Sequence, residues 1–175
     1  MDIRPASNTD IDAITVIYNH AVEHTTAIWN ERIVDAADRQ RWLADRQAAG
    51  FPVLVATEPA GEPGDGNSGT GRAEVLGYAT YGPWRNFDGF RHTVEHSVYV
   101  REDRQGKGIG TSLMTALIGQ ARTAGIHVMV AAIEAGNSGS IGLHEKLGFT
   151  PVGMLPEVGT KFDRWLDLAF LQLTL

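Results

Sequence analysis

The segment 96–114, "HSVYVREDRQGKGIGTSLM", places a strand, a glycine-rich turn and the start of a helix close together. Side chains alternate through its first residues, and Gly106, Gly108 and Gly110 follow almost at once. A helix N-terminus carries unpaired N–H groups and the positive end of the helix dipole, and glycines let a backbone approach a ligand. The segment therefore predicts an anion-binding loop, most simply one for a phosphate.

Two familiar phosphate loops do not match this turn. A P-loop requires Ser or Thr directly after its lysine, whereas Lys107 is followed by Gly108. A dinucleotide fingerprint requires G-x-G-x-x-G, whereas the chain has G-K-G-I-G. The pattern that does match is Q-x-x-G-x-G, from Gln105 to Gly110. A plain glycine-rich connection between strand and helix remains the alternative.

Length, composition and charge exclude several classes of protein. A chain of 175 residues suits one domain. It has no cysteine, which excludes disulfides, thiolate nucleophiles and cysteine metal sites. Its formal charge of −6 argues against a nucleic-acid partner, and no apolar run approaches the roughly 20 residues of a membrane helix. The start lacks a signal-peptide pattern, so we expect a soluble, cytoplasmic protein that binds no membrane.

Hydrophobic periodicity predicts a mixed α+β domain over 1–175. The expected strands are 2–6, 51–57, 75–84, 91–100, 127–133, 149–155 and 164–175. The expected helices are 11–22, 35–49, 107–124 and 138–147. The third of these has an apolar face of residues four apart, Ile109, Leu113, Leu117 and Ala121. The Gly/Pro-rich segment 58–74 predicts a flexible loop inserted between two strands.

Together with Q-x-x-G-x-G, the segment 131–149, "AAIEAGNSGSIGLHEKLGF", resembles the GNAT superfamily of acyl-coenzyme A-dependent N-acetyltransferases. The stretches "VEHSVYV" and "GTKFDRWLDLAFLQ" are similar to the branch of phosphinothricin, methionine sulfoximine and methionine sulfone N-acetyltransferases. The resemblance covers nearly the whole chain except 58–74. It implies a mostly antiparallel sheet of seven strands, splayed between the fourth and fifth and flanked by about four helices. Many family members have Tyr at the position of His144, although this branch also carries His.

The resemblance implies acetyl-coenzyme A as cosubstrate. The strand before the turn would bind its pantetheine arm, the glycine loop its pyrophosphate, and an asparagine its pantetheine or acetyl region. The residues assigned to it in this way are Val98, Tyr99, Val100, Gln105, Gly106, Lys107, Gly108, Ile109, Gly110, Thr111 and Asn137.

Acyl transfer to an amine requires a neutral amine, yet a free α-amino group with a pKa of about 7.7–8.0 is mostly protonated at neutral pH. Glu95, an acidic residue in mid-strand that the resemblance places at the acceptor end of the cleft, is the candidate base. The alternatives are that it holds the substrate ammonium or is a solvent-facing charge. His144 is the candidate proton donor to the leaving thiolate, a second polar group at the amine, or a structural residue.

The resemblance places the acceptor pocket around the segment "WRNF" and the middle of the following strand. Arg85 suits a carboxylate, which it can bind with two parallel hydrogen bonds. No metal is expected, because His92 and His96 lack a carboxylate or cysteine at matching spacing. The expected acceptor-binding residues are Trp29, Arg85, Asn86, Phe87, Glu95, His96 and Ser97.

The leading hypothesis is an enzyme that acetylates the α-amine of a small amino-acid analogue. Two alternatives stay open, namely the same chemistry on a peptide N-terminus or polyamine, and a coenzyme A-binding module without turnover. The apolar final segment "FDRWLDLAFLQLTL" also predicts a homodimer, through Trp165, Leu168, Phe170 and Leu173.

Overall fold

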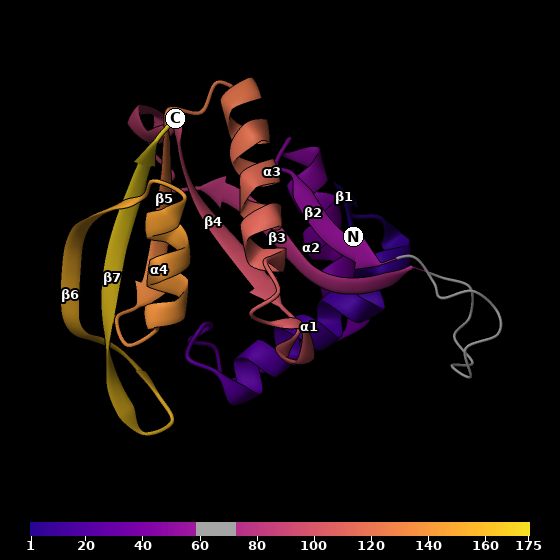
Figure 1. The fold of residues 1–175 in the computed structure, drawn as a ribbon, viewed down its shortest axis with the longest axis horizontal. Helices are drawn as coiled ribbons and strands as arrows, with labels where there is room; N and C mark the ends of the chain where they lie inside the picture. Colours follow the sequence, from indigo (N-terminus) through magenta and orange to yellow (C-terminus); the bar gives the residue numbers. More distant parts are fainter. Residues whose placement is uncertain (59–72) are drawn as a thin grey trace.

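The computed structural model describes residues 1–58 and 73–175, and in them a single sheet is flanked by helices (Figure 1). Its seven strands have the order β1-β2-β3-β4-β5-β7-β6, and only the neighbours β4 and β5 run parallel. The strands are β1 (Asp2–Pro5), β2 (Val53–Glu58), β3 (Glu74–Pro83), β4 (Thr93–Val100), β5 (Val128–Glu134), β6 (Thr150–Lys161) and β7 (Arg164–Thr174). The helices are α1 (Ile11–His24), α2 (Ala36–Ala48), α3 (Ile109–Thr123) and α4 (Ser138–Lys146). The predicted fold class and element order are confirmed.

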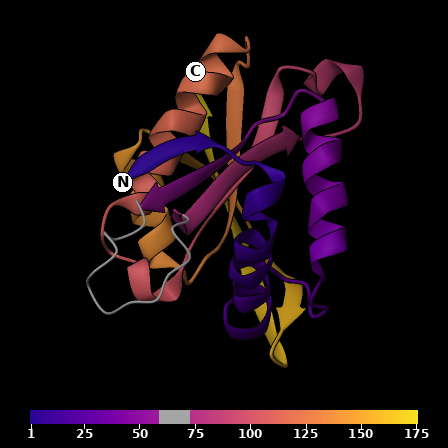
Figure 2. The same cartoon turned by 90° about the vertical axis from the view of Figure 1, so that its right-hand side faces the viewer.

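The sheet forms the middle of three layers (Figure 2). The helices α1 and α2 cover one face, where Ile14, Leu43 and Val55 are buried together. On the other face the predicted apolar side of α3 packs on the sheet, with Leu113 and Leu117 fully buried. Burying each such side chain contributes about 1.5–3 kcal/mol. The layers therefore hold both ends of the turn between β4 and α3 in place.

The sheet splays between its two parallel strands. Only residues 93–95 of β4 pair with β5, opposite residues 128–130. Beyond that point β5 continues its pairing with β7, while β4 continues with β3. The second half of β4 therefore has no strand partner on the β5 side within the described chain. The predicted splay is confirmed.

Two boundaries differ from the sequence prediction. The helix predicted from residue 107 begins at Ile109, because Gly108 has φ 79° and caps the helix from a left-handed conformation. The strand predicted to end at 155 continues to Lys161, because pairing with β7 resumes after an irregularity between Leu155 and Gly159. The ends of the predicted loop 58–74 belong to β2 and β3, and Ala73 directly precedes β3. Residues 59–72 of the predicted loop lie outside the described residues. None of the helices within 1–58 and 73–175 has the length and apolarity needed to cross a bilayer.

Candidate active site

A cleft of about 940 Å³ opens where β4 and β5 separate. Its walls come from the second half of β4, the loop into α3, one side of α4 and the C-terminal half of α1. It brings together nearly all the predicted cofactor residues: Val98, Tyr99, Val100, Gln105, Gly106, Gly108, Ile109, Gly110, Thr111 and Asn137. Lys107 lies outside this lining, exposed to solvent, where its Nζ donates to the Asp103 carbonyl oxygen at 3.2 Å.

The glycine loop gives the cleft an anion-binding end. Gly106 has φ 73° and Gly108 φ 79°, conformations that side chains with a Cβ rarely adopt. A Cβ on Gly110 would lie 3.1 Å from Leu143 Cδ1, so this position keeps α3 close to α4. The first N–H groups of α3 have no acceptor within the helix. The loop therefore presents backbone donors and the positive end of a helix dipole to the cleft.

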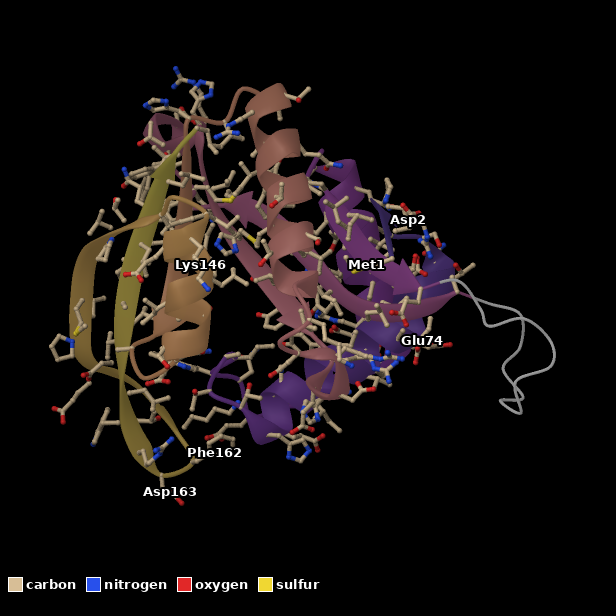
Figure 3. The ribbon with its side chains drawn as sticks, viewed as in Figure 1. Met1, Asp2, Glu74, Lys146, Phe162 and Asp163 are labelled. Atoms are coloured by element: carbon tan, nitrogen blue, oxygen red, sulfur yellow. The ribbon has the colours of Figure 1, made fainter. Side chains whose placement is uncertain are left out.

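The α1 side of the cleft was missed by sequence reasoning. Val16, His20 and Ala21 on α1, with Thr25 and Ala27 beyond its end, line the cleft. No local pattern connects α1 to β4, since the two elements meet only in the folded sheet. On the opposite wall Lys146 of α4 was also missed (Figure 3).

A buried lysine holds the end of α1 in position. Lys161, 2% exposed at the end of β6, donates to the carbonyl oxygens of Thr25 at 2.7 Å, Ala21 at 3.5 Å and Ile28. Burial lowers the pKa of the Lys161 ammonium, although Glu31 opposes this shift. The cation satisfies carbonyls that the end of a helix leaves free.

Two arginines of the cleft join a network of ion pairs. Arg101 pairs with Glu74 and Asp103, and Arg104 pairs with Glu74 at 2.9 Å and with Glu58 at 3.4 Å. The network connects the adjacent ends of β2 and β3 to the loop that precedes the glycines.

Glu95 is half-buried on the face of the sheet that α1 and α2 cover, together with Ser97 and Tyr99. Burial raises the pKa of the Glu95 carboxyl, while the positive charge of Arg85 opposes this shift. Burial also raises the pKa of Tyr99 to about 12, although a hydrogen bond from Ser97 lowers it. A half-buried carboxyl with a raised pKa, three residues before the part of β4 that lines the cleft, is the type of group that serves as a general base.

The segment "WRNF" lies at the surface, outside the cleft lining. Arg85, Asn86 and Phe87 are exposed, and Phe87 is 73% exposed, which is unusual for a large apolar side chain. The Arg85 guanidinium lies 5.0 Å from the centre of the Trp84 ring. Trp29 is held on the α1 side, where its Nε1 donates to the Thr26 carbonyl oxygen at 2.9 Å.

His96 and His144 contact each other on the opposite face from Glu95. Their rings stack with centroids 4.9 Å apart, and their Nε2 atoms lie 3.1 Å apart. His144 Nδ1 lies 2.7 Å from the Ser140 carbonyl oxygen. Both rings are buried, so neither shares a surface with Glu95 and Ser97. The expectations that His96 binds the acceptor and that His144 donates a proton stay predictions.

The model of the acetyltransferase (GNAT) family matches residues 14–149, which include β4, the glycine loop and α4. The chain belongs to the acetyltransferase (GNAT) family. Within that family, the L-methionine sulfoximine/L-methionine sulfone acetyltransferase of Pseudomonas aeruginosa is 57% identical over 173 residues, 99% of this chain and 94% of the relative. The L-amino acid N-acyltransferase MnaT of Escherichia coli is 53% identical, over 100% of this chain and 94% of its own. A phosphinothricin N-acetyltransferase of Alcaligenes faecalis is 34% identical, over 97% and 80%.

Solved GNAT structures share the whole architecture. An acetyltransferase from Salmonella typhimurium, solved with its cofactor acetyl-CoA, superposes with a TM-score of 0.90 at 53% identity, covering 99% of this chain and 93% of its own. A phosphinothricin acetyltransferase from Sinorhizobium meliloti, in complex with acetyl-CoA, superposes with a TM-score of 0.89 at 33% identity, covering 99% and 88%. Within residues 1–58 and 73–175 of this GNAT chain, no group of His, Cys, Asp and Glu side chains is arranged to hold a metal ion.

The left-handed conformation of Gly108 allows the anion-binding role of the glycine loop in this GNAT protein to be tested by substitution. Gly108→Val adds a β-branched side chain at φ 79°, so the loop must rearrange to relieve the strain. We expect the Michaelis constant for acetyl-CoA to rise at least about fivefold, since backbone strain of this kind costs about 1–3 kcal/mol. Gly119→Ala on α3, where an added Cβ meets nothing within 4 Å, is the control. An unchanged Michaelis constant in a folded Gly108→Val variant contradicts the assignment.

Proposed function

We propose that this protein transfers the acetyl group of acetyl-CoA to the α-amine of a small, polar amino-acid analogue of the methionine sulfone, methionine sulfoximine or phosphinothricin type. The observation that carries the proposal is Glu95, a half-buried carboxyl with a raised pKa at the point where the sheet splays. The 57% identity to a methionine sulfoximine/sulfone acetyltransferase over nearly the full length supports the substrate class.

The cleft offers groups that can bind the pyrophosphate and the pantetheine arm of coenzyme A. The loop 106–111 offers backbone donors for the pyrophosphate, and the unpaired side of β4 at 98–100 can hydrogen-bond an extended, amide-bearing chain as a neighbouring strand does. Asn137 Oδ1 accepts from the Ser140 N–H at 3.0 Å, which fixes the start of α4 and leaves the Asn137 amide nitrogen beside the cleft. When bound, acetyl-CoA supplies the activated acetyl thioester.

Glu95 removes the proton from the attacking amine, directly or through one water molecule. A carboxylate with an ordinary pKa is a weak base toward an α-ammonium group, and burial brings the two pKa values closer together. In its ionised form Glu95 also holds the ammonium before the proton leaves.

Arg85 binds the carboxylate of the acceptor. Its charge acts on Glu95, its guanidinium is exposed, and a planar guanidinium binds a carboxylate with two parallel hydrogen bonds. Together, Glu95 and Arg85 select an α-amino acid, because Glu95 attracts its ammonium group and Arg85 attracts its carboxylate. Sulfone, sulfoximine and phosphinate groups share a tetrahedral, polar geometry, so one pocket can accommodate all three.

A thiol-release assay with acetyl-CoA and a panel of amines tests this function. We expect turnover with L-methionine sulfone, L-methionine sulfoximine and L-phosphinothricin. We expect a much lower kcat/KM with 3-(methylsulfonyl)propylamine, which is methionine sulfone without its carboxylate. Spermidine and a short peptide represent the alternative acceptors. Faster turnover with either of them overturns the substrate class, and no thiol release with any amine favours a module without turnover.

We further propose that the protein is a homodimer that pairs through the edge formed by β6 and β7 (Figure 1). Along β6, Val152, Met154, Leu155 and Val158 are 44–57% exposed, and Trp165 of β7 is 67% exposed. A run of exposed apolar residues on a sheet edge is the surface that soluble proteins bury against a partner. Of the other residues predicted for this contact, Leu168 and Phe170 are half-buried and Leu173 is buried within the sheet. The cytoplasmic location stays a prediction.

Light scattering at micromolar protein concentration measures the mass of the protein in solution and so tests the proposed dimer. We expect twice the chain mass of 19.0 kDa for the wild type, and a shift toward the single-chain mass for Trp165→Glu, which places a charge in the contact. Val16→Glu, which changes an exposed apolar residue on α1, is the control and is expected to remain dimeric. A wild-type mass of one chain contradicts the proposal.

A further inference from the structure

The helix α4 is anchored to the sheet by a histidine. Among its nine residues His144 is the one that is fully buried, with 1% of its surface exposed. A helix that covers a core normally packs with apolar side chains. The rings of His144 and His96 instead meet under α4, and Phe149 packs edge-on against both, at 5.1 Å and 5.6 Å between centroids. A polar contact therefore occupies the centre of this part of the core.

The partners of each ring determine where its protons lie. The Ser140 carbonyl oxygen can only accept, so His144 Nδ1, 2.7 Å away, carries a proton. In the neutral ring His144 Nε2 is then an acceptor, and His96 Nε2, 3.1 Å away, donates to it. His96 Nδ1 is left as a buried acceptor without a protein partner in the described residues. The reverse assignment would make two lone pairs face each other and bury an unpaired N–H.

The surroundings keep both rings uncharged. Burial lowers the pKa of His96 to about 3, and the proximity of His144 adds to this shift. Burial also lowers the pKa of His144, against the hydrogen bond to Ser140. The pair therefore has one N–H between its two rings and a second N–H directed at the Ser140 backbone, and neither proton is available to a group in the cleft.

The pair lies at the point where β4 and β5 stop pairing with each other. Glu95 is the last residue of β4 that pairs with β5, and His96 is the next residue. From this point the cofactor cleft separates β4 from α4, whose residues 138–140, Leu143 and Lys146 form one wall. The hydrogen bond between His96 and His144 joins β4 to α4 beside the cleft, although neither ring is among the residues that line it.

We propose that the His96–His144 pair is a neutral clamp that fixes α4 against β4 across the splay and so sets the shape of the cofactor cleft. In this role His144 is a positioning residue, and it does not protonate the leaving thiolate. The proposal rests on the proposed function in one respect, namely that coenzyme A occupies the cleft.

Two replacements of His144 separate a clamp from a proton donor. In His144→Gln the amide oxygen reaches the position of Nε2 and can accept from His96, so the clamp is retained. In His144→Asn the amide nitrogen takes the position of Nδ1 and keeps the Ser140 bond, but the side chain does not reach His96. Neither amide acts as an acid or a base at neutral pH, so both variants lose the proton donor.

Steady-state kinetics with acetyl-CoA distinguish the two roles. For a clamp, we expect His144→Asn to raise the Michaelis constant for acetyl-CoA about fivefold to tenfold, the effect of one lost hydrogen bond, and His144→Gln to change it by less than about twofold. His96→Leu and His96→Gln are expected to show the same contrast, because only Gln keeps a donor at the position of Nε2. An equal fall in kcat of about 10²-fold or more in both His144 variants, with an unchanged Michaelis constant, overturns the proposal.

Two measurements do not depend on turnover. Calorimetric titration with coenzyme A should show the same contrast between His144→Asn and His144→Gln in the dissociation constant, even if every amine tested proves to be a poor acceptor. Nitrogen NMR of the wild-type protein should show His144 protonated on Nδ1 and His96 on Nε2, with both rings uncharged at neutral pH. A ring that is charged at neutral pH, or the opposite tautomers, contradicts the clamp.

Discussion

Glu95→Gln is expected to lower turnover by about 10²–10⁴-fold, the usual contribution of a positioned general base. The replacement keeps the size of the side chain and most of its hydrogen bonding, but removes its basicity. The Michaelis constant for acetyl-CoA should change little, because Glu95 lies outside the lining of the cofactor cleft. The measurement is kcat against pH for the wild type and the variant.

The pH dependence has a definite sign. Wild-type turnover should fall as the pH drops through the raised pKa of Glu95, since only the carboxylate accepts a proton. The deficit of Glu95→Gln should shrink as the pH rises through the pKa of the acceptor's α-ammonium group, because more of the amine is then neutral without help from a base.

Stability serves as an internal check on Glu95→Gln. A carboxyl whose pKa is raised in the folded state favours folding at low pH, and this contribution is lost as the pH rises through the folded pKa. At neutral pH the buried charge therefore opposes folding, and the variant should melt at the wild-type temperature or slightly above it. Glu23→Gln, an exposed carboxyl on α1, is the matched control for turnover. Wild-type turnover of Glu95→Gln at neutral pH would remove Glu95 as the base.

Lys161→Met is expected to produce the largest loss of stability among these variants. Methionine keeps the length and apolar body of the side chain, but leaves the Thr25 and Ile28 carbonyl oxygens without their donor. A buried polar group left unpaired costs about 1–3 kcal/mol, so two predict a loss of about 2–6 kcal/mol in the free energy of unfolding. For a chain of this length that is a fall in Tm of about 4–24 °C.

Thermal unfolding of Lys161→Met should be compared with that of Lys107→Met, which removes an exposed ammonium and should change Tm by about 2 °C or less. The Michaelis constant for acetyl-CoA should also rise in Lys161→Met, because Thr25 lines the cleft. A Tm equal to that of the wild type would show that the three carbonyl bonds of Lys161 contribute nothing to stability.

The parts of the structure that sequence reasoning predicted well are those encoded locally. Leu113 and Leu117 recur at helical spacing, and burial of that face follows from the spacing alone. The pattern from Gln105 to Gly110 is contiguous, so the loop was identified from the sequence itself, whereas Val98 and Asn137 were assigned through the resemblance to the family. The elements on either side of it followed from the same periodicity.

The parts that were missed depend on contacts between distant segments. Lys161 donates to Thr25 across 136 positions, and His96 meets His144 across 48. Alternation of side chains along β4 places His96 and Glu95 on opposite faces of the sheet. The sequence does not indicate which of the two faces binds the acceptor amine. The end of β6 was also missed, because pairing with β7 outweighed the turn signals of its glycines and proline.

The most direct test of the central claim is the stoichiometry and site of acetylation. The protein is incubated with acetyl-CoA and L-methionine sulfone, free thiol is quantified, and the product is identified by mass spectrometry and proton NMR. The account predicts one thiol released for each molecule of product, with the acetyl group on the α-nitrogen and no product in the absence of protein. Thiol release without an N-acetylated product, or no reaction with L-methionine sulfone, L-methionine sulfoximine and L-phosphinothricin alike, would contradict it.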